Sequence, residues 1–130
     1  MKYVMDASAL LAMTQFEVGG KLVEDLIASG SCMASSVNIA EVGSKLLDQG
    51  LNEAELAQAL SELDVEVIDF DLELATQCAK LRKLTRHAGL SLGDRACLAL
   101  AEQKQATAVT SDRAWSAVEE AVGVEVLQIR

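Results

Sequence analysis

Short apolar segments alternate with helix-like segments along the whole chain, and this alternation limits the folds open to it. A helical segment separates each expected strand from the next, which favours right-handed crossovers and a largely parallel sheet. The length of 130 residues fits one domain spanning residues 1–130. The sequence therefore predicts a single α/β domain. The expected strands are residues 2–5, 31–34, 65–68, 108–110 and 125–129.

Helices are expected where apolar residues recur at helical spacing, between polar residues that mark the helix ends. Asn52 and Glu55 have the spacing of a capping box, and Asp71 can cap the helix after it. Two short strands, 65–68 and 108–110, suit positions covered on both faces. The expected helices are residues 7–13, 21–28, 37–47, 53–63, 72–87, 93–103 and 113–118.

The composition limits the classes of function that the chain can have. A net charge of −9 argues against binding nucleic acid through charge alone, because phosphate contacts need lysine and arginine. Metal ions between the protein and a phosphate would remove that objection. Cys32, Cys78 and Cys97 lack the spacing of a zinc site or disulfide framework, so we expect buried, reduced thiols. With no signal peptide and no membrane span in the sequence, we expect the protein in the cytoplasm.

Two aspartates stand at the ends of expected strands. Asp6 ends the first strand, and Asp112 follows the strand 108–110 almost directly. Ligands of open α/β sheets bind at the carboxyl ends of the strands, so the two carboxylates can meet if these strands are neighbours. The alternative is local, because each aspartate can also cap the helix that follows it.

Glu41 lies in the expected helix 37–47, on the side opposite Ile39 and Val42. The helical spacing therefore points its side chain to water or a cleft and not to the core. The alternative is a solvated ion pair with Lys45, four residues further along the helix.

Asp94 lies three residues after Ser91, which is the spacing of a capping box. The helix that follows is apolar on nearly every face and should be central and buried. A charged side chain at the mouth of a buried helix is costly unless it is paired or bound to metal. This favours a functional role for Asp94 over a purely local cap.

Converging carboxylates would define the chemistry. They repel one another and ionise together only when cations lie between them. Oxygen ligands without histidine or cysteine suit Mg²⁺ or Mn²⁺, which can activate water and neutralise a phosphate. His87 is the only histidine, which excludes a two-histidine ribonuclease mechanism, and no glycine-rich phosphate loop is present.

Four of the eleven basic residues lie in the expected helix 72–87, namely Lys80, Arg82, Lys83 and Arg86. They can guide a phosphate chain towards the segment that contains Asp94. The alternative is a solvated helix end, where cations interact favourably with the helix dipole.

Four segments of the chain together resemble the motifs of PIN-domain ribonucleases, most closely the VapC toxins of type II toxin–antitoxin modules. Their order fits, and the resemblance covers essentially the whole chain. The segments are VMDASALL at 4–11, NIAEV at 38–42, LSLGDRACLALA at 90–101 and VTSD at 109–112.

The resemblance implies a three-layer α/β/α PIN fold and a Mg²⁺- or Mn²⁺-dependent endoribonuclease. It implies an acidic pocket, metal ligands and RNA as substrate. It also implies a homodimer and a cognate antitoxin partner. The implied catalytic residues are Asp6, Glu41, Asp94 and Asp112; the metal ligands are Asp6, Asp94 and Asp112; Ser8 and Thr110 are supporting polar contacts. Lys80, Lys83 and Arg86 are candidate RNA contacts on the basis of their charge and position, not of the resemblance.

Two other functions remain open at this point. One is a receiver-type phosphoacceptor domain, with Asp69 after the strand 65–68 as the acceptor. A receiver domain requires an acidic pair after the first strand, where this chain has Asp6 alone. It also requires a lysine after a late strand, where this chain has Ser111 and Asp112. The other is a non-catalytic binding module that keeps the fold, against which the four intact acids argue.

Overall fold

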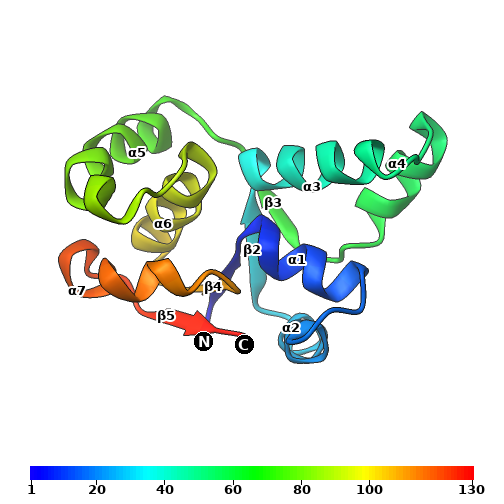
Figure 1. The fold of residues 1–130 in the computed structure, drawn as a ribbon, viewed down its shortest axis with the longest axis horizontal. Helices are drawn as coiled ribbons and strands as arrows, with labels where there is room; N and C mark the ends of the chain where they lie inside the picture. The colour runs from blue at the N-terminus through cyan, green and yellow to red at the C-terminus, as the bar shows by residue number, and fades with distance from the viewer.

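The computed structural model describes residues 1–130 and contains one five-stranded sheet (Figure 1). All neighbouring strands are parallel, and their order is β3-β2-β1-β4-β5. The predicted α/β fold with a parallel sheet is confirmed, and each strand lies within two residues of its expected position. The strands are β1 (Tyr3–Met5), β2 (Cys32–Ser35), β3 (Glu66–Ile68), β4 (Thr107–Thr110) and β5 (Val126–Gln128).

Every predicted helical segment is helical. The main difference is at 113–118, where a short 3₁₀ helix, η2, forms and a further helix, α7, follows it up to Gly123. The helices are α1 (Ala7–Thr14), α2 (Gly20–Ala28), α3 (Ser36–Asp48), α4 (Glu53–Ser61), α5 (Leu72–Thr85), η1 (Arg86–Ala88), α6 (Leu92–Lys104), η2 (Arg113–Ala117) and α7 (Glu119–Val122).

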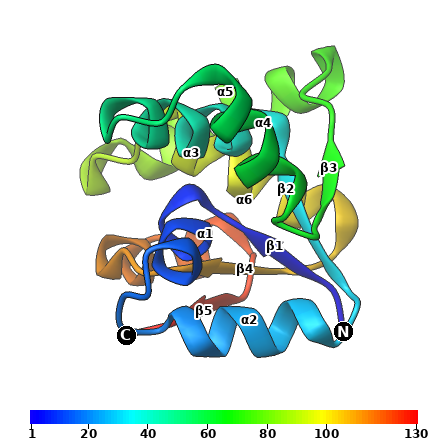
Figure 2. The same ribbon diagram turned by 90° about the vertical axis from the view of Figure 1, so that its right-hand side faces the viewer.

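The sheet separates two cores, which gives the molecule three layers. Side chains alternate along each strand, so Val4 and Ala108 face one core while Met5 and Val109 face the other. Helices α5, α6 and α7 with η2 close the first core, and α1 to α4 close the second (Figure 1). On the second face, α1 lies between α2 and α3 (Figure 2).

Helix α6 is the most deeply buried helix, as its apolar faces predict. Every residue from Ala96 to Ala101 is at most 1% exposed. Full burial of a leucine such as Leu98 or Leu100 contributes about 1.5–3 kcal/mol. This packing fixes the first turn of α6, which carries Asp94, against the sheet.

One prediction about the sheet is wrong. The strand 65–68 was expected to be covered on both faces, but Glu66 and Val67 of β3 are exposed. The reason is that β3 is an edge strand that pairs only with β2. The other strand in that prediction, β4, is buried along its whole length, so the prediction is correct for β4.

The order in which strands are added to the sheet reverses at β1, although all strands are parallel. From β1 the chain moves to β2 and β3 on one side, and β4 and β5 occupy the other side. The carboxyl ends of β1 and β4 therefore form the topological switch point, where open α/β sheets bind ligands. None of the helices is both long and apolar enough to cross a membrane.

Candidate active site

Asp6 lies at the switch point and is held by three donors. It follows β1, is 3% exposed, and its backbone N–H donates to Val109 O at 3.1 Å. Asp6 Oδ1 accepts from Ser8 Oγ at 2.7 Å and from the backbone N–H of Ala9 at 2.8 Å. Asp6 Oδ2 accepts from Thr110 Oγ1 at 2.6 Å. Asp6 therefore caps α1, as the local alternative predicted, and also reaches across to β4.

A small hydrogen-bond network joins the ends of β1 and β4. Ser8 Oγ and Thr110 Oγ1 are 3.3 Å apart, and Ser8 Oγ accepts the backbone N–H of Ser111 at 3.0 Å. Thr110 Oγ1 accepts the backbone N–H of Asp112 at 3.0 Å. The two predicted supporting residues thus contact Asp6 directly, and they connect it to the loop that carries Asp112.

Asp94 forms the predicted capping box. Its Oδ2 accepts the backbone N–H of Ser91 at 2.9 Å, and Ser91 Oγ accepts the backbone N–H of Asp94 at 3.2 Å. The box leaves Asp94 Oδ1 without a protein partner. Asp94 is partly exposed, and its charge acts on Asp6. Both the local and the functional interpretation of Asp94 are therefore compatible with the structure.

Glu41 is exposed, as predicted, but it does not pair with Lys45; the ion pairs of the structure are those of Lys21. Instead, Glu41 Oε1 accepts from Asn38 Nδ2 at 2.8 Å. Its carboxylate lies over Gly93 in the first turn of α6, where a Cβ would overlap it. Glu41 of α3 is therefore placed beside the residue that precedes Asp94.

Burial raises the pKa of Asp6 from 3.8 to about 6, and the charge of Asp94 adds to this. The hydrogen bonds from Thr110, Ser8 and Ala9 act in the opposite direction and favour the ionised carboxylate. Beneath the acids, burial raises the pKa of the Cys97 thiol well above its ordinary value, with further contributions from the charges of Asp6, Asp94 and Glu41. The charges of Asp6, Asp94 and Glu41 therefore all act on the same buried thiol, which indicates that these three carboxylates lie near one another.

Asp112 differs from the other three acids. Its side chain is exposed, and its Oδ1 accepts the backbone N–H of Ala114 at 2.9 Å, so it caps η2. The local alternative for Asp112 is thus observed. No three histidine, cysteine, aspartate or glutamate side chains form a group that could hold a metal ion as they stand. The predicted ligand set of Asp6, Asp94 and Asp112 is therefore not assembled in advance.

The donor chemistry nevertheless fits a hard divalent cation. Asp94 Oδ1 and Glu41 Oε2 accept no hydrogen bond from the protein, and Asp6 Oδ2 accepts only one. No lysine, arginine or histidine forms an ion pair with Asp6, Glu41 or Asp94, so no protein cation neutralises these carboxylates. Oxygen donors of this kind suit Mg²⁺ or Mn²⁺.

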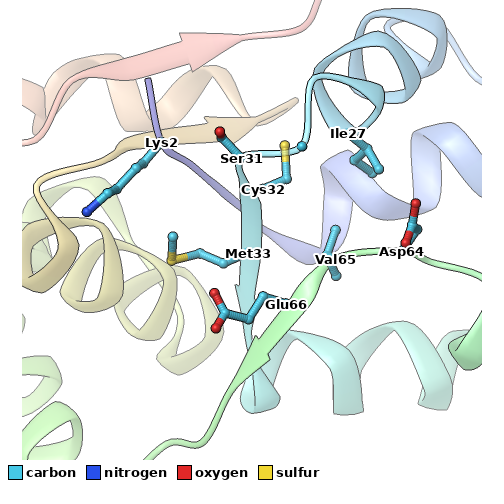
Figure 3. Close-up of a pocket in the computed structure, with 9 residues that line it drawn as sticks. Lys2, Ile27, Ser31, Cys32, Met33, Asp64, Val65 and Glu66 are labelled. Carbon is cyan, nitrogen blue, oxygen red and sulfur yellow. The ribbon is translucent and has the colours of Figure 1, made fainter.

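None of the four acids lines a cavity of the structure. Asp6 is buried, whereas Glu41 and Asp112 are exposed. The largest cavity, of about 520 Å³, lies at the amino ends of β1, β2 and β3, away from the acids (Figure 3). Lys2, Ser31, Asp64 and Glu66 contribute its polar lining. The expected acidic pocket is therefore not an enclosed cavity, and it combines one buried acid with acids at the surface.

Sequence reasoning missed Asn38, although the side chain is 1% exposed and contacts Glu41. Its position three residues before Glu41, on the same side of a helix, is the signal that could have indicated it. The basic residues Lys80, Lys83 and Arg86 are all exposed, as predicted. Arg86 belongs to η1, because the expected helix 72–87 ends as an α-helix at Thr85.

A parallel sheet of order 3-2-1-4-5 with acids at its switch point defines an open α/β fold whose ligand site is expected at the carboxyl ends of β1 and β4. It differs from the 2-1-3-4-5 order of receiver domains. In addition, Asp69 follows the edge strand β3 and not a neighbour of β1. The receiver alternative therefore does not fit the structure.

Comparison with known families makes the assignment specific. The family model of the PIN domain matches residues 3–121, so the chain belongs to the PIN-domain family. The resemblance inferred from the four motifs is confirmed. Comparison with curated proteins gave no match.

Solved structures with a similar fold include VapC-containing complexes. VapBC2 from Rickettsia felis, bound to a promoter DNA fragment, gives a TM-score of 0.75 at 18% identity and covers 98% of each chain. DNA-bound VapBC from Salmonella typhimurium gives a TM-score of 0.77 at 17% identity, covering 100% of this chain and 99% of the other. VapC20 from Mycobacterium tuberculosis, a toxin that cleaves the sarcin–ricin loop, gives 0.71 at 20% identity, covering 89% and 94%. At these identities the likeness establishes the fold.

Proposed function

We propose that the protein is a Mg²⁺- or Mn²⁺-dependent endoribonuclease that acts in the cytoplasm as the toxin of a toxin–antitoxin pair. The observation that carries this proposal is the position of Asp6. It is buried at the switch point of a PIN-domain sheet, held by Ser8 and Thr110, and within reach of the charge of Asp94. The likeness to VapC structures, one of them an RNA-cleaving toxin, supports the substrate class.

Asp6 and Asp94 would hold the cation, with Asp112 as a third ligand. When bound, the cation would supply charge neutralisation for the phosphate and activation of water. Asp112 would have to turn from its cap on η2, and its exposed side chain has the freedom to do so. The three carboxylates would thus come together as the cation binds.

The chain's own residues would perform the remaining tasks. Ser8 and Thr110 favour the ionised form of Asp6 and fix the direction of its oxygens. Glu41, exposed beside the first turn of α6, would accept the proton of the attacking water. The water oxygen would bond to phosphorus while the bond from phosphorus to the 3′ oxygen breaks. The departing 3′ oxygen would take up a proton from solvent, and Glu41 would return its proton to solvent, which leaves a 5′-phosphate and a 3′-hydroxyl.

Lys80, Lys83 and Arg86 would contact the RNA backbone outside the cleavage site. All three are exposed, and η1 leads through Gly89 to Ser91 at the start of α6. This path would bring a negatively charged strand towards an otherwise acidic protein.

A cognate antitoxin and a second copy of this chain are the proposed protein partners. The VapBC complexes among the similar folds support the first. For the second copy, Phe16 and Val18 are apolar side chains two residues apart that are 94% and 71% exposed and would be covered in an interface. Light scattering of the purified chain tests the dimer, and co-purification with the product of a neighbouring reading frame tests the antitoxin.

Cleavage of total cellular RNA tests the enzyme function directly. Purified protein should cut RNA in Mg²⁺ or Mn²⁺, and Asp6→Asn and Asp94→Asn should reduce the rate by at least 100-fold on the scale typical of general acid–base and electrostatic contributions. Asparagine at position 6 keeps a helix-capping side chain, so the fold is preserved. Asp69→Asn, at an exposed position outside the site, is the matched control.

Full cleavage in EDTA, or by the Asp6→Asn protein, would contradict the proposal. Calorimetry with Mn²⁺ separates the non-catalytic alternative. A PIN-fold binding module without chemistry would give no metal binding at millimolar concentration and no RNA cleavage.

A further inference from the structure

We propose that Gly93 and Asn38 are positioning residues for Glu41: Gly93 leaves the space in which the Glu41 carboxylate lies, and Asn38 holds it there. This inference rests on the proposed function for its consequence in catalysis. The geometry itself is independent of the function. It joins α3, which carries Glu41, to the first turn of α6, which carries Asp94.

The space above Gly93 is the first observation. A Cβ on Gly93 would lie 2.5 Å from Glu41 Cδ, closer than side-chain atoms can approach. Gly93 lies inside α6 and has no left-handed backbone angle, so its conformation does not require glycine. Glycine destabilises a helix relative to alanine. The residue is therefore explained by the carboxylate above it and not by the backbone.

The amide of Asn38 is the second observation. Its Nδ2 donates to Glu41 Oε1 at 2.8 Å and to the backbone oxygen of Gly93 at 3.0 Å. Both partners are acceptors, so the orientation of the amide is fixed. One side chain thus binds the glutamate and the helix turn on which the glutamate rests.

Asn38 Oδ1 is the third observation. It is buried and has no hydrogen-bond partner, while the whole residue is only 1% exposed. A buried acceptor without a donor is costly. The amide keeps this orientation because its Nδ2 donates to both Glu41 and Gly93. The two contacts that hold Glu41 on α6 therefore outweigh the cost of the unpaired oxygen.

Without these two residues, Glu41 would be an ordinary exposed side chain. Lys45 is one helical turn away and would be its nearest opposite charge along α3. An added methyl group at position 93 displaces only the end of a flexible side chain, so the fold should survive. The substitution Gly93→Ala therefore separates the position of Glu41 from the stability of the protein.

The experiment compares Gly93→Ala with Gly43→Ala, a matched helical glycine in α3. A Cβ at Gly43 would lie 3.4 Å from Leu56 Cδ1, an ordinary contact. Both variants should melt at an unchanged or slightly higher temperature, because alanine favours the helix. Only Gly93→Ala should lower kcat for RNA cleavage, by about tenfold or more, because it displaces the group that accepts the proton of water. Mn²⁺ affinity should stay unchanged in both variants, since Glu41 is not one of the proposed ligands.

A double-mutant cycle with Glu41→Gln tests whether Gly93→Ala lowers kcat by displacing the Glu41 carboxylate. If Gly93→Ala acts by displacing Glu41, it should add almost nothing in the Glu41→Gln protein. Additive losses would overturn the inference, because they would place the effect of Gly93 elsewhere. Gly93→Ala with unchanged kcat would overturn it as well.

A crystal structure of each protein keeps the two proposals distinguishable. If the wild type neither cuts RNA nor binds Mn²⁺, the proposed function fails. The inference about position then stands if the Glu41 carboxylate lies over Gly93 in the wild type and is displaced in Gly93→Ala. It fails if the carboxylate occupies the same place in both structures or never lies over Gly93.

Discussion

Thr110 Oγ1 donates a 2.6 Å hydrogen bond to Asp6 Oδ2, although the two residues are 104 positions apart in the chain. The bond exists because β1 and β4 are parallel neighbours in register, with Met5 opposite Val109. It therefore connects the acid at the end of one strand to the loop after the other. Asp6 is both a helix cap and the central acid of the site.

The stability of the protein should fall as the pH rises from about 4 to 6. The folded state binds the Asp6 proton more tightly than the unfolded state, with a pKa of about 6 against 3.8. Stability that is complete below pH 4 is therefore lost as Asp6 ionises, by about 3 kcal/mol above pH 6.

Urea unfolding of the metal-free protein between pH 4.5 and 7.5 measures this loss. Asp6→Asn should reduce the slope and be more stable than wild type at pH 7.5. Asp112→Asn, at an exposed acid, should leave the slope unchanged. A wild-type stability that rises steadily through this range would contradict the burial argument.

Removing the Thr110 hydroxyl should make Asp6 harder to ionise. Thr110→Val keeps the shape of the side chain but loses the bond that lowers the Asp6 pKa. We expect the acid limb of the pH–activity profile to move to higher pH and the free energy of unfolding to fall by about 1–2 kcal/mol. Thr107→Val, a buried threonine at the other end of β4, is the control and should leave the acid limb in place.

A divalent cation should stabilise the folded protein at pH 7.5. Mn²⁺ at about 100 times its Kd would add about 2.7 kcal/mol, because the unfolded chain lacks the assembled carboxylates. The gain should be smaller at pH 5, where Asp6 holds its proton. Calorimetric melting with Mn²⁺ and then EDTA measures the effect, and an Asp94→Asn protein with the full gain would exclude Asp94 as a ligand.

The exposed basic residues should affect RNA affinity more than chemistry. The double substitution Lys83→Ala with Arg86→Ala should raise KM and leave kcat almost unchanged. It should also reduce the salt dependence of binding, by about 0.7 in the log–log slope for each lost phosphate contact with a single strand. Lys21→Ala is the control, since Lys21 is already paired with Glu24 and Asp25. A fall in kcat alone would place these residues in the cleavage step.

Local sequence signals decided where the elements begin. The capping boxes at Asn52 and Ser91 form as predicted, because their donors and acceptors lie within three residues of each other. The apolar faces of α6 correctly predicted its burial. The edge position of β3 was not predictable from its own residues, because an edge is defined only by the strand that is absent on one side.

By itself the sequence determined the alternation of strands and helices, the caps, and the carboxylates at the strand ends. Only the tertiary structure decided which side chains each of these carboxylates contacts. The pairing of β1 with β4 places Thr110 on Asp6, and the packing of α3 on α6 places Glu41 over Gly93. These contacts depend on strand order and on the space between helices, which the spacing of residues within any one segment does not contain.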